Sequence, residues 1–203
     1  MQLSSRFDHA LAYASDVHRA QQRKGTPVPY LSHILIVTGM VLEHGGDEEE
    51  AIAALLHDAV EDQGGDARLA EIRTRFGERV AEIVLGCSDT TLSPKPPWSE
   101  RKQRYLKHLP TALASVRLVS VADKVANARA ILADYRIEGE QVWTRFNATG
   151  PEILWYYRSL VQGFREAGGT PLVDELDRVV SELERLTGGS GAGSNTAWAA
   201  TIE

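Results

Sequence analysis

The chain has 203 residues, with 22 Lys and Arg against 28 Asp and Glu, which gives a formal net charge of −6 at pH 7. A hydrophobic content of 43% with 25% charged residues is typical of a folded globular protein and excludes disorder over the whole length. The acidic balance argues against a nucleic-acid partner, since dedicated nucleic-acid binders usually carry a basic excess. The longest apolar stretch, 111–133, is interrupted by charges, so we expect no membrane-spanning segment.

Apolar residues recur at helical spacing along most of the chain, and they predict an all-α fold. The segment 90–98 contains three prolines and is expected to be a loop. Two Pro residues, Pro151 and Pro171, lie where the first residue of a helix tolerates them. In chain order, the predicted helices cover 3–22, 32–43, 47–62, 66–76, a stretch around 80–84, 100–109, a long helix after Pro110 to about 132, a helix starting at 150–151, and 171–186.

Local capping signals support several of these boundaries. Asp47 and Glu50 stand in the spacing of a capping box, and Ser99 is expected to cap the basic helix that follows it. Residues 1–187 are expected to form one domain. Residues 188–203 read as a flexible Gly/Ser-rich tail. The only cysteine, Cys87, cannot form an internal disulfide, so we expect a cytoplasmic protein.

The strongest chemical signal is His57-Asp58 within an otherwise apolar predicted helix. Burying an imidazole beside a carboxylate is costly unless the two are paired or bind a metal. At about 100° per residue, Glu61 lies on the side of His57, and Asp62 on the side of Asp58. Carboxylates so close together repel one another, and a bound cation is the simplest way to hold them. The alternative is a solvated helix end.

A metal would need further ligands, and two charged residues in other apolar segments can supply them. His33 and Asp123 each stand in an apolar run, where a satisfied core histidine and a structural ion pair with Lys124 or Arg129 are the alternatives. Together with His57 and Asp58 they make a set of two imidazoles and two carboxylates. That mixed set suits Mn²⁺, Fe²⁺ or Zn²⁺ better than Ca²⁺ or Mg²⁺.

The order of these residues resembles the H…HD…D signature of the HD-domain metal-dependent phosphohydrolases. Other segments resemble motifs of the RelA/SpoT-type hydrolase domains, in the family's order: Arg23–His33, Leu55–Asp62, Phe76-Gly77, Glu100–Lys102 and Ala122–Asn127. The chain therefore resembles the stand-alone small alarmone hydrolases, relatives of the metazoan SpoT homologue. This resemblance implies an HD-domain bundle of about eight to ten helices.

The resemblance also implies an activity and a set of residue roles. The activity is Mn²⁺-dependent removal of the 3′-diphosphate from (p)ppGpp-like or (p)ppApp-like nucleotides, with release of pyrophosphate. Residues matching the family's positions would bind the metal (His33, His57, Asp58 and Asp123), perform catalysis (Glu61 and Asp62) and contact the nucleotide (Arg23, Lys24 and Asn127). Ala130 replaces a hydroxyl found in some relatives, which leaves guanine and adenine open as the base.

Further basic residues are candidates because a substrate with several phosphates needs cations. Lys95, Arg101 and Arg145 are candidate substrate-binding residues, whereas Lys102 and Arg104 are interpreted as part of a solvated helix face. Two other functions stay open: an HD-type phosphohydrolase acting on NADPH or another phosphorylated nucleotide, and a non-catalytic metal-bound nucleotide sensor. The presence of both Glu61 and Asp62 favours an enzyme. The sequence leaves homo-oligomer formation open.

Overall fold

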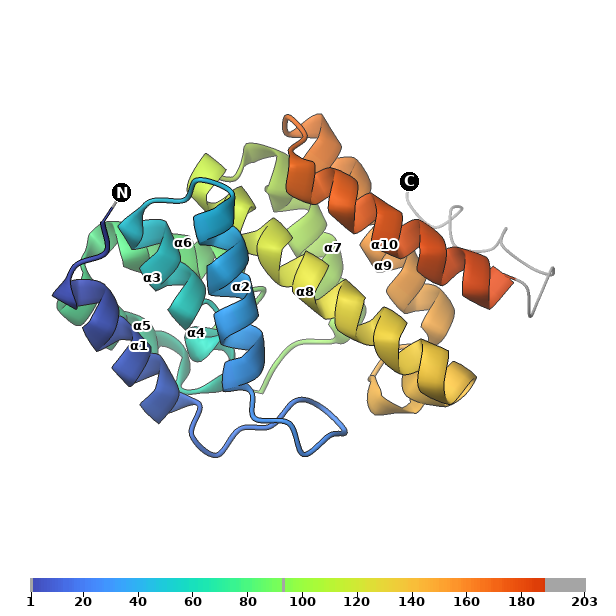
Figure 1. The fold of residues 1–203 in the computed structure, drawn as a ribbon, viewed down its shortest axis with the longest axis horizontal. Coiled ribbons are helices and arrows are strands. Elements are labelled where there is room, and N and C mark those ends of the chain that lie inside the picture. Colours follow the sequence, from blue (N-terminus) through green and yellow to red (C-terminus); the bar gives the residue numbers. More distant parts are fainter. Residues whose placement is uncertain (1, 93, 189–203) are drawn as a thin grey trace.

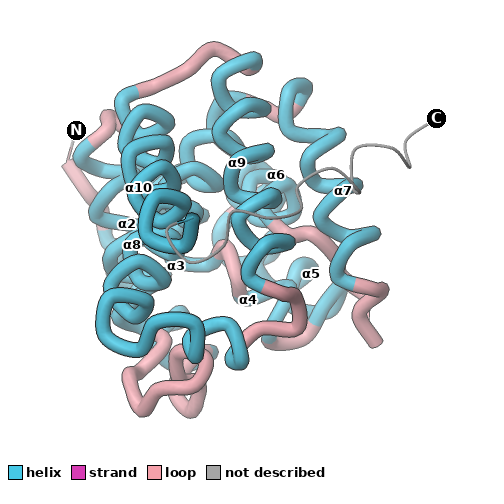
Figure 2. The backbone as a smooth tube through the Cα atoms, turned by 90° about the vertical axis from the view of Figure 1, so that its right-hand side faces the viewer, coloured by secondary structure: helices cyan, strands magenta, loops and turns pink. Residues whose placement is uncertain are grey.

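The computed structural model describes residues 2–92 and 94–188 of the chain. Within these ranges the chain is helical apart from loops, and one isolated bridge between Gln22 and Pro29 is the extent of β pairing (Figures 1 and 2). The predicted all-α fold is confirmed. The helices are α1 Ser5–Val17, α2 Leu31–Glu43, α3 Glu48–Leu56, α4 Ala59–Asp62, α5 Gly65–Phe76, α6 Glu78–Cys87, α7 Trp98–His108, α8 Ala114–Glu138, α9 Gly150–Glu166 and α10 Pro171–Gly188, with 3₁₀ helices η1 Leu109–Thr111 and η2 Gly139–Arg145.

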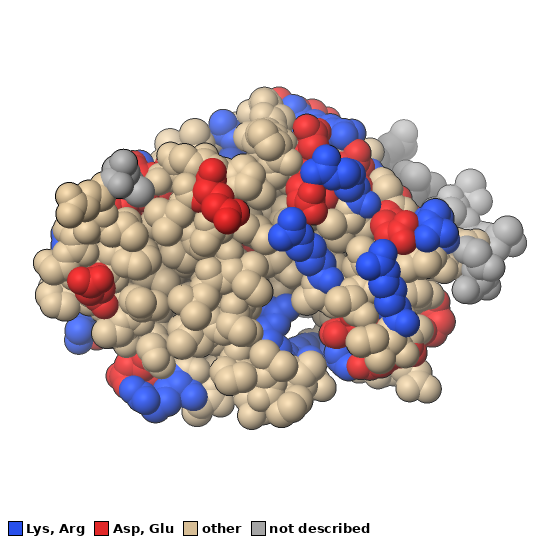
Figure 3. All heavy atoms as spheres, viewed as in Figure 1, with Lys and Arg blue, Asp and Glu red and all other residues tan. Residues whose placement is uncertain are grey.

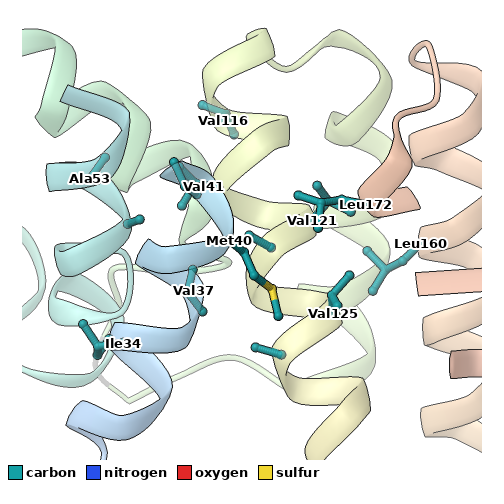
Figure 4. Packing of buried hydrophobic residues seen from close by; sticks show 14 of the residues in the cluster. Ile34, Val37, Met40, Val41, Ala53, Val116, Val121, Val125, Leu160 and Leu172 are labelled. Atoms are coloured by element: carbon teal, nitrogen blue, oxygen red, sulfur yellow. The ribbon is translucent and has the colours of Figure 1, made fainter. Parts of the chain in front are cut away.

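The long helix α8 runs through the middle of the molecule and contacts both halves of the helical assembly (Figure 1). On one side it packs against α2, α3 and α6, and on the other against α9 and α10. Figure 4 shows Met40 of α2 extending toward Val125 of α8, and Leu172 of α10 beside Val121. These side chains are buried. Two apolar faces of α8 therefore join the N-terminal and C-terminal helices into one core.

The helix α3 is central to the N-terminal half, as its apolar sequence predicts. All residues from Ala51 to Leu56 are fully buried, and α3 contacts α1, α2 and α6. Its start has the predicted capping box, in which Asp47 accepts from the Glu50 amide and the Glu50 carboxylate accepts from the Asp47 amide. Because α3 is buried on all sides, its packing also fixes the position of the residues that follow Leu56.

Several predicted boundaries differ from the structure. The first helix ends at Val17 instead of near residue 22, because the chain turns at His18 and returns through the bridge between Gln22 and Pro29. The basic helix begins at Trp98 after Pro97, so Ser99 lies inside it and is not its cap. The long helix α8 continues to Glu138 and stops at Gly139, whose φ of 59° is unfavourable for other residues.

The predicted single helix over 47–62 is interrupted at His57 and Asp58. The imidazole Nδ1 of His57 lies 2.8 Å from the carbonyl oxygen of Ala54, the carbonyl to which the Asp58 amide would donate in a continuous helix. Asp58 has ψ of −5° and lies directly before the short helix α4. This side-chain hydrogen bond competes with the backbone ladder and separates α3 from α4.

No helix in the described ranges has both the length and the apolar character needed to cross a membrane. The tail predicted over 188–203 lies outside the described residues from position 189 onward. The division into a domain and a tail therefore stays a prediction.

The packing of α10 against α8 and α9 can be tested by a core truncation. Leu176 is fully buried in α10, so we expect Leu176→Ala to lower the free energy of unfolding by about 2–5 kcal/mol, through lost transfer energy and the cavity left behind. Ile137→Ala, at a side chain that is 82% exposed on α8, should change it by less than about 0.5 kcal/mol. Equal effects in urea titrations of the two variants would contradict this packing.

Candidate metal centre

Four side chains from separate parts of the chain meet inside the molecule. One ligand atom from each lies within 4.8 Å of the others: His33 on α2, His57 and Asp58 at the break between α3 and α4, and Asp123 on α8. The Nε2 atom of His33 lies 3.2 Å from Asp123 Oδ1, and the Nε2 atom of His57 lies 3.0 Å from Asp58 Oδ2. The structure thus brings together all four residues that the sequence nominates as ligands.

The two imidazoles direct unpaired nitrogens into this cluster. Because a carbonyl oxygen only accepts, His57 Nδ1 carries the hydrogen toward Ala54, and in the neutral form of the ring that binds a metal the lone pair is on Nε2. Nε2 of both His33 and His57 is buried without a hydrogen-bond partner among the described residues. Leaving such an atom unsatisfied costs about 1–3 kcal/mol. Two imidazole nitrogens beside two carboxylates fit a divalent transition-metal ion, which would take up those lone pairs.

The two acids of the cluster are held in the charged form. Burial on its own raises the pKa of Asp58. Without a metal, however, the charges of Asp58 and Asp123 raise the pKa of His57 well above its usual range, and the positive charge of that ring holds the pKa of Asp58 well below the usual range. Burial acts in the same way on Asp123, and the charge of Lys124 holds the pKa of this carboxyl well below the usual range. Both are therefore carboxylates at neutral pH, the form that binds a metal.

Neighbouring side chains orient these carboxylates. The Tyr30 hydroxyl donates to Asp58 Oδ2 at 2.5 Å, and Lys124 Nζ donates to Asp123 Oδ2 at 2.6 Å. Asn127, one helical turn after Asp123, donates to its Oδ1 at 2.5 Å. Outer partners of this kind hold ligands in place and tune their affinity. The role of Tyr30 was missed in the sequence, although it belongs to the same motif as His33.

The acidic pair after the cluster lies on α4, which the break at His57 and Asp58 separates from α3. Lys95 Nζ donates to Glu61 Oε1 at 2.9 Å and to Asp62 Oδ1 at 3.1 Å, which joins the two acids. Burial raises the pKa of Glu61, and the charge of Asp89 adds to this effect. Asp62 lines the cavity described next.

A cavity of about 710 Å³ opens beside the cluster and shares His33 with it. The space-filling view shows a hollow with Lys and Arg atoms in its walls (Figure 3). Two acids, Asp62 and Asp134, line the cavity, and they are outnumbered by the cations that line it: Arg23, Lys24, Lys102, Lys124 and Arg145. In a chain with a net charge of −6, this is a local concentration of positive charge suited to an anion.

The nominated substrate-binding residues divide into two groups. Arg23 donates to the Asn127 amide oxygen at 3.0 Å, and Lys24 Nζ lies 5.8 Å from the centre of the Phe146 ring, so these partners are uncharged. Arg145 lines the cavity but pairs with Asp134 at 2.7 Å and with Glu138. Arg23, Lys24, Asn127 and Arg145 thus lie together in the cavity wall.

The other two candidates, Lys95 and Arg101, are engaged by acids of the protein. Arg101 is buried, and its guanidinium bonds both oxygens of Asp89, at 2.6 and 2.5 Å. The Asp89 side chain, which is only 4% exposed, also accepts from Lys102 at 2.6 Å. The interpretation of Lys102 as part of a solvated helix face is therefore wrong. It lines the cavity, and burial followed by the charge of Lys124 lowers its pKa.

Tyr156 also lines the cavity. Its ring is buried, and Lys102 Nζ lies 5.1 Å from the ring centre. Its hydroxyl is buried without a hydrogen-bond partner among the described residues, in the wall of the cavity. A ligand with acceptor atoms would satisfy this group.

Comparison with known proteins agrees with this geometry. The family described as HD domain matches residues 10–150 of the chain. Guanosine-3′,5′-bis(diphosphate) 3′-pyrophosphohydrolase MESH1 of Xenopus tropicalis is 37% identical over 123 residues, which are 59% of this chain and 66% of that protein. The protein named MESH1 in Drosophila melanogaster is 31% identical over 145 residues, covering 70% of this chain and 76% of the relative.

Longer relatives match over a smaller share of their length. The guanosine-3′,5′-bis(diphosphate) 3′-pyrophosphohydrolase of Aquifex aeolicus is 36% identical over 64% of this chain, but the match spans 18% of that protein. Among solved structures, that of a metazoan ortholog of SpoT, described as hydrolysing ppGpp, superimposes with a TM-score of 0.71 at 27% identity. The superposition covers 93% of this chain and 98% of that one. The resemblance to RelA/SpoT-type hydrolases is confirmed.

Proposed function

The chain belongs to the HD domain family, and on that premise we propose that it hydrolyses the 3′-diphosphate of (p)ppGpp-like or (p)ppApp-like nucleotides and releases pyrophosphate. One observation carries the proposal: the buried His/Asp cluster and the cationic cavity share His33. A group able to hold a metal therefore borders a space able to hold a polyanion. The relatives named as ppGpp 3′-pyrophosphohydrolases support the same chemistry.

The cavity suits a nucleotide that carries phosphates on both the 3′ and the 5′ oxygen of its ribose. Its volume of about 710 Å³ lies within the range of small-molecule sites. We assign Arg23, Lys24, Asn127 and Arg145 to nucleotide binding, and we propose that Arg23 stacks its planar guanidinium on the base. The Tyr156 hydroxyl and the Lys102 ammonium are further groups of the cavity wall that can bind phosphate or ribose oxygens.

We assign His33, His57, Asp58 and Asp123 as ligands of a divalent cation, with Mn²⁺ the preferred ion and Fe²⁺ or Zn²⁺ the alternatives. Such an ion supplies Lewis-acid chemistry and neutralises phosphate charge when it is bound. Tyr30, Lys124 and Asn127 then hold the ligand carboxylates in their orientation through the hydrogen bonds described above.

The proposed roles of Glu61 and Asp62 concern the attacking water. Hydrolysis adds water across the bond between the 3′ oxygen and its diphosphate, leaving a 3′ hydroxyl and pyrophosphate. Asp62 lines the cavity and can orient the water, while Glu61, whose pKa is raised mainly by burial, can accept its proton. Lys95 joins the two acids by donating to both of them.

The function is tested by incubating metal-free protein with Mn²⁺ and a panel of nucleotides: ppGpp, pppGpp, ppApp, NADPH and simple 5′-nucleotides. Chromatography should find pyrophosphate and a nucleotide with a free 3′ hydroxyl from the alarmones. If NADPH is the only nucleotide in the panel that loses a phosphate, the phosphohydrolase alternative replaces this proposal. Tight alarmone binding with no product would identify a sensor.

The metal assignment predicts the behaviour of two variants. His57→Ala and Asp58→Ala should abolish both metal retention and turnover, because each removes a ligand atom from the cluster. His9→Ala, at an exposed position on α1, should retain the metal content of the unmodified protein. Elemental analysis after dialysis gives the answer, and undiminished metal in both cluster variants would overturn the assignment.

The acid pair predicts a different signature. Glu61→Gln and Asp62→Asn should each lower kcat by about 10²–10⁴, the usual contribution of a positioned acid–base group. Metal content should stay the same because neither side chain belongs to the cluster. Asp66→Asn, at an exposed acid in the first turn of α5, serves as the matched control. Steady-state hydrolysis at wild-type rates by both variants of the pair would contradict the mechanism.

A further inference from the structure

The side chain of Gln21, in the turn after α1, contacts Asp62 across 41 residues of sequence. Its Nε2 donates to Asp62 Oδ2 at 3.0 Å. Its Oε1 accepts from Gln63 Nε2 at 2.8 Å and lies 2.7 Å from His18 Nδ1. The backbone is held as well, because the Gln21 amide donates to His18 O and the Tyr30 amide donates to Gln21 O.

These contacts determine which atom of each group carries the hydrogen. A carboxylate only accepts, so the nitrogen of the Gln21 amide must be the atom that faces Asp62. The amide oxygen then faces His18, and His18 Nδ1 must be the protonated nitrogen. His18 is 2% exposed, and burial lowers its pKa, so the ring is neutral. Asp62 on α4 thereby sets the amide orientation of Gln21 and, through it, the tautomer of His18.

Asp62 is held from two sides by different parts of the chain. Lys95 donates to Oδ1 at 3.1 Å, and Gln21 donates to Oδ2 at 3.0 Å. Anchoring both oxygens fixes the plane of a carboxylate that is otherwise free to rotate about its last torsion. Of the two donors, Gln21 carries no charge, so it restrains Asp62 without neutralising it.

We infer that Gln21 is a positioning residue for the hydrolysis, orienting Asp62 through an amide whose direction is set by His18 and Gln63. The inference rests on the proposed function, in which Asp62 orients the attacking water. A purely structural Gln21 would hold the turn after α1 and have no effect that depends on Asp62. The two possibilities differ in kinetics and in their dependence on the carboxylate.

The kinetic test uses Gln21→Leu, which keeps the approximate volume and removes both amide groups. With Mn²⁺ and ppGpp, kcat should fall about 10- to 100-fold, as expected for a misplaced catalytic group, while KM and metal content stay unchanged. In the Asp62→Asn background, measured in single turnovers at high protein concentration, Gln21→Leu should have no further effect. Gln103→Leu, at an exposed position on α7, is the control.

A second readout needs no substrate. The ¹⁵N shifts of the His18 ring should identify the Nδ1-protonated tautomer in the unmodified protein, and this preference should be lost in Gln21→Leu. An Nε2-protonated ring in the unmodified protein would overturn the inference. A wild-type kcat in Gln21→Leu would also overturn it, as would an equal fall in the rate when Gln21→Leu is added to Asp62→Asn. In either case, alarmone cleavage by the unmodified protein would leave the proposed function standing. If the unmodified protein cleaves no alarmone, the proposed function fails, and with it the role of Gln21 in this reaction.

Discussion

Two carboxylates and two imidazole nitrogens lie within 4.8 Å of one another in a largely buried cluster, and this arrangement constrains much of the molecule around it. Like charges in a medium of low dielectric repel one another strongly, so the acids need compensating cations close by. Lys124 supplies one, beside Asp123. The Nε2 atoms of His33 and His57 are buried without a hydrogen-bond partner among the described residues. Because the four residues come from α2, α8 and the break after α3, the cluster exists only while those helices keep their mutual packing. The buried faces of α2, α3 and α8 therefore hold the cluster together as much as its own hydrogen bonds do.

The break at His57 and Asp58 separates two groups of charged side chains within six residues of sequence. The hydrogen bond from His57 to the Ala54 carbonyl interrupts the helix and presents both residues to the cluster. The acids of α4 then point to a different set of partners, namely Lys95, Gln21 and the backbone amide of Asp89. A continuous helix would have crowded four charged groups along one rim. The interruption allows the acids of the cluster and the acids of α4 to be held by separate networks, each with its own donors.

The free-energy cost of burying an unpaired charge also explains how the charged residues are distributed. The chain as a whole is acidic, yet the cations that line the cavity outnumber its acids. Three of these cations are held by acids of the protein: Lys102 by Asp89, Lys124 by Asp123 and Arg145 by Asp134. Arg23 and Lys24 lie against uncharged groups, the Asn127 amide and the Phe146 ring. A polyanionic ligand would therefore meet two cations without an acidic partner in these contacts, together with others whose orientation is set in advance.

The sequence by itself determined the helical fold, because apolar periodicity and capping act between residues three or four positions apart. It also identified the four clustered residues, since a charged group within an apolar run has few stable states other than pairing or metal binding. The partners of charged residues distant in sequence were decided by tertiary structure alone. Asp89 gave no local signal, yet it binds Arg101 and Lys102 twelve and thirteen residues further on. Gln21 reaches Asp62 because the turn after α1 packs beside α4. Such contacts depend on where helices come to rest against one another, and no local spacing encodes that position.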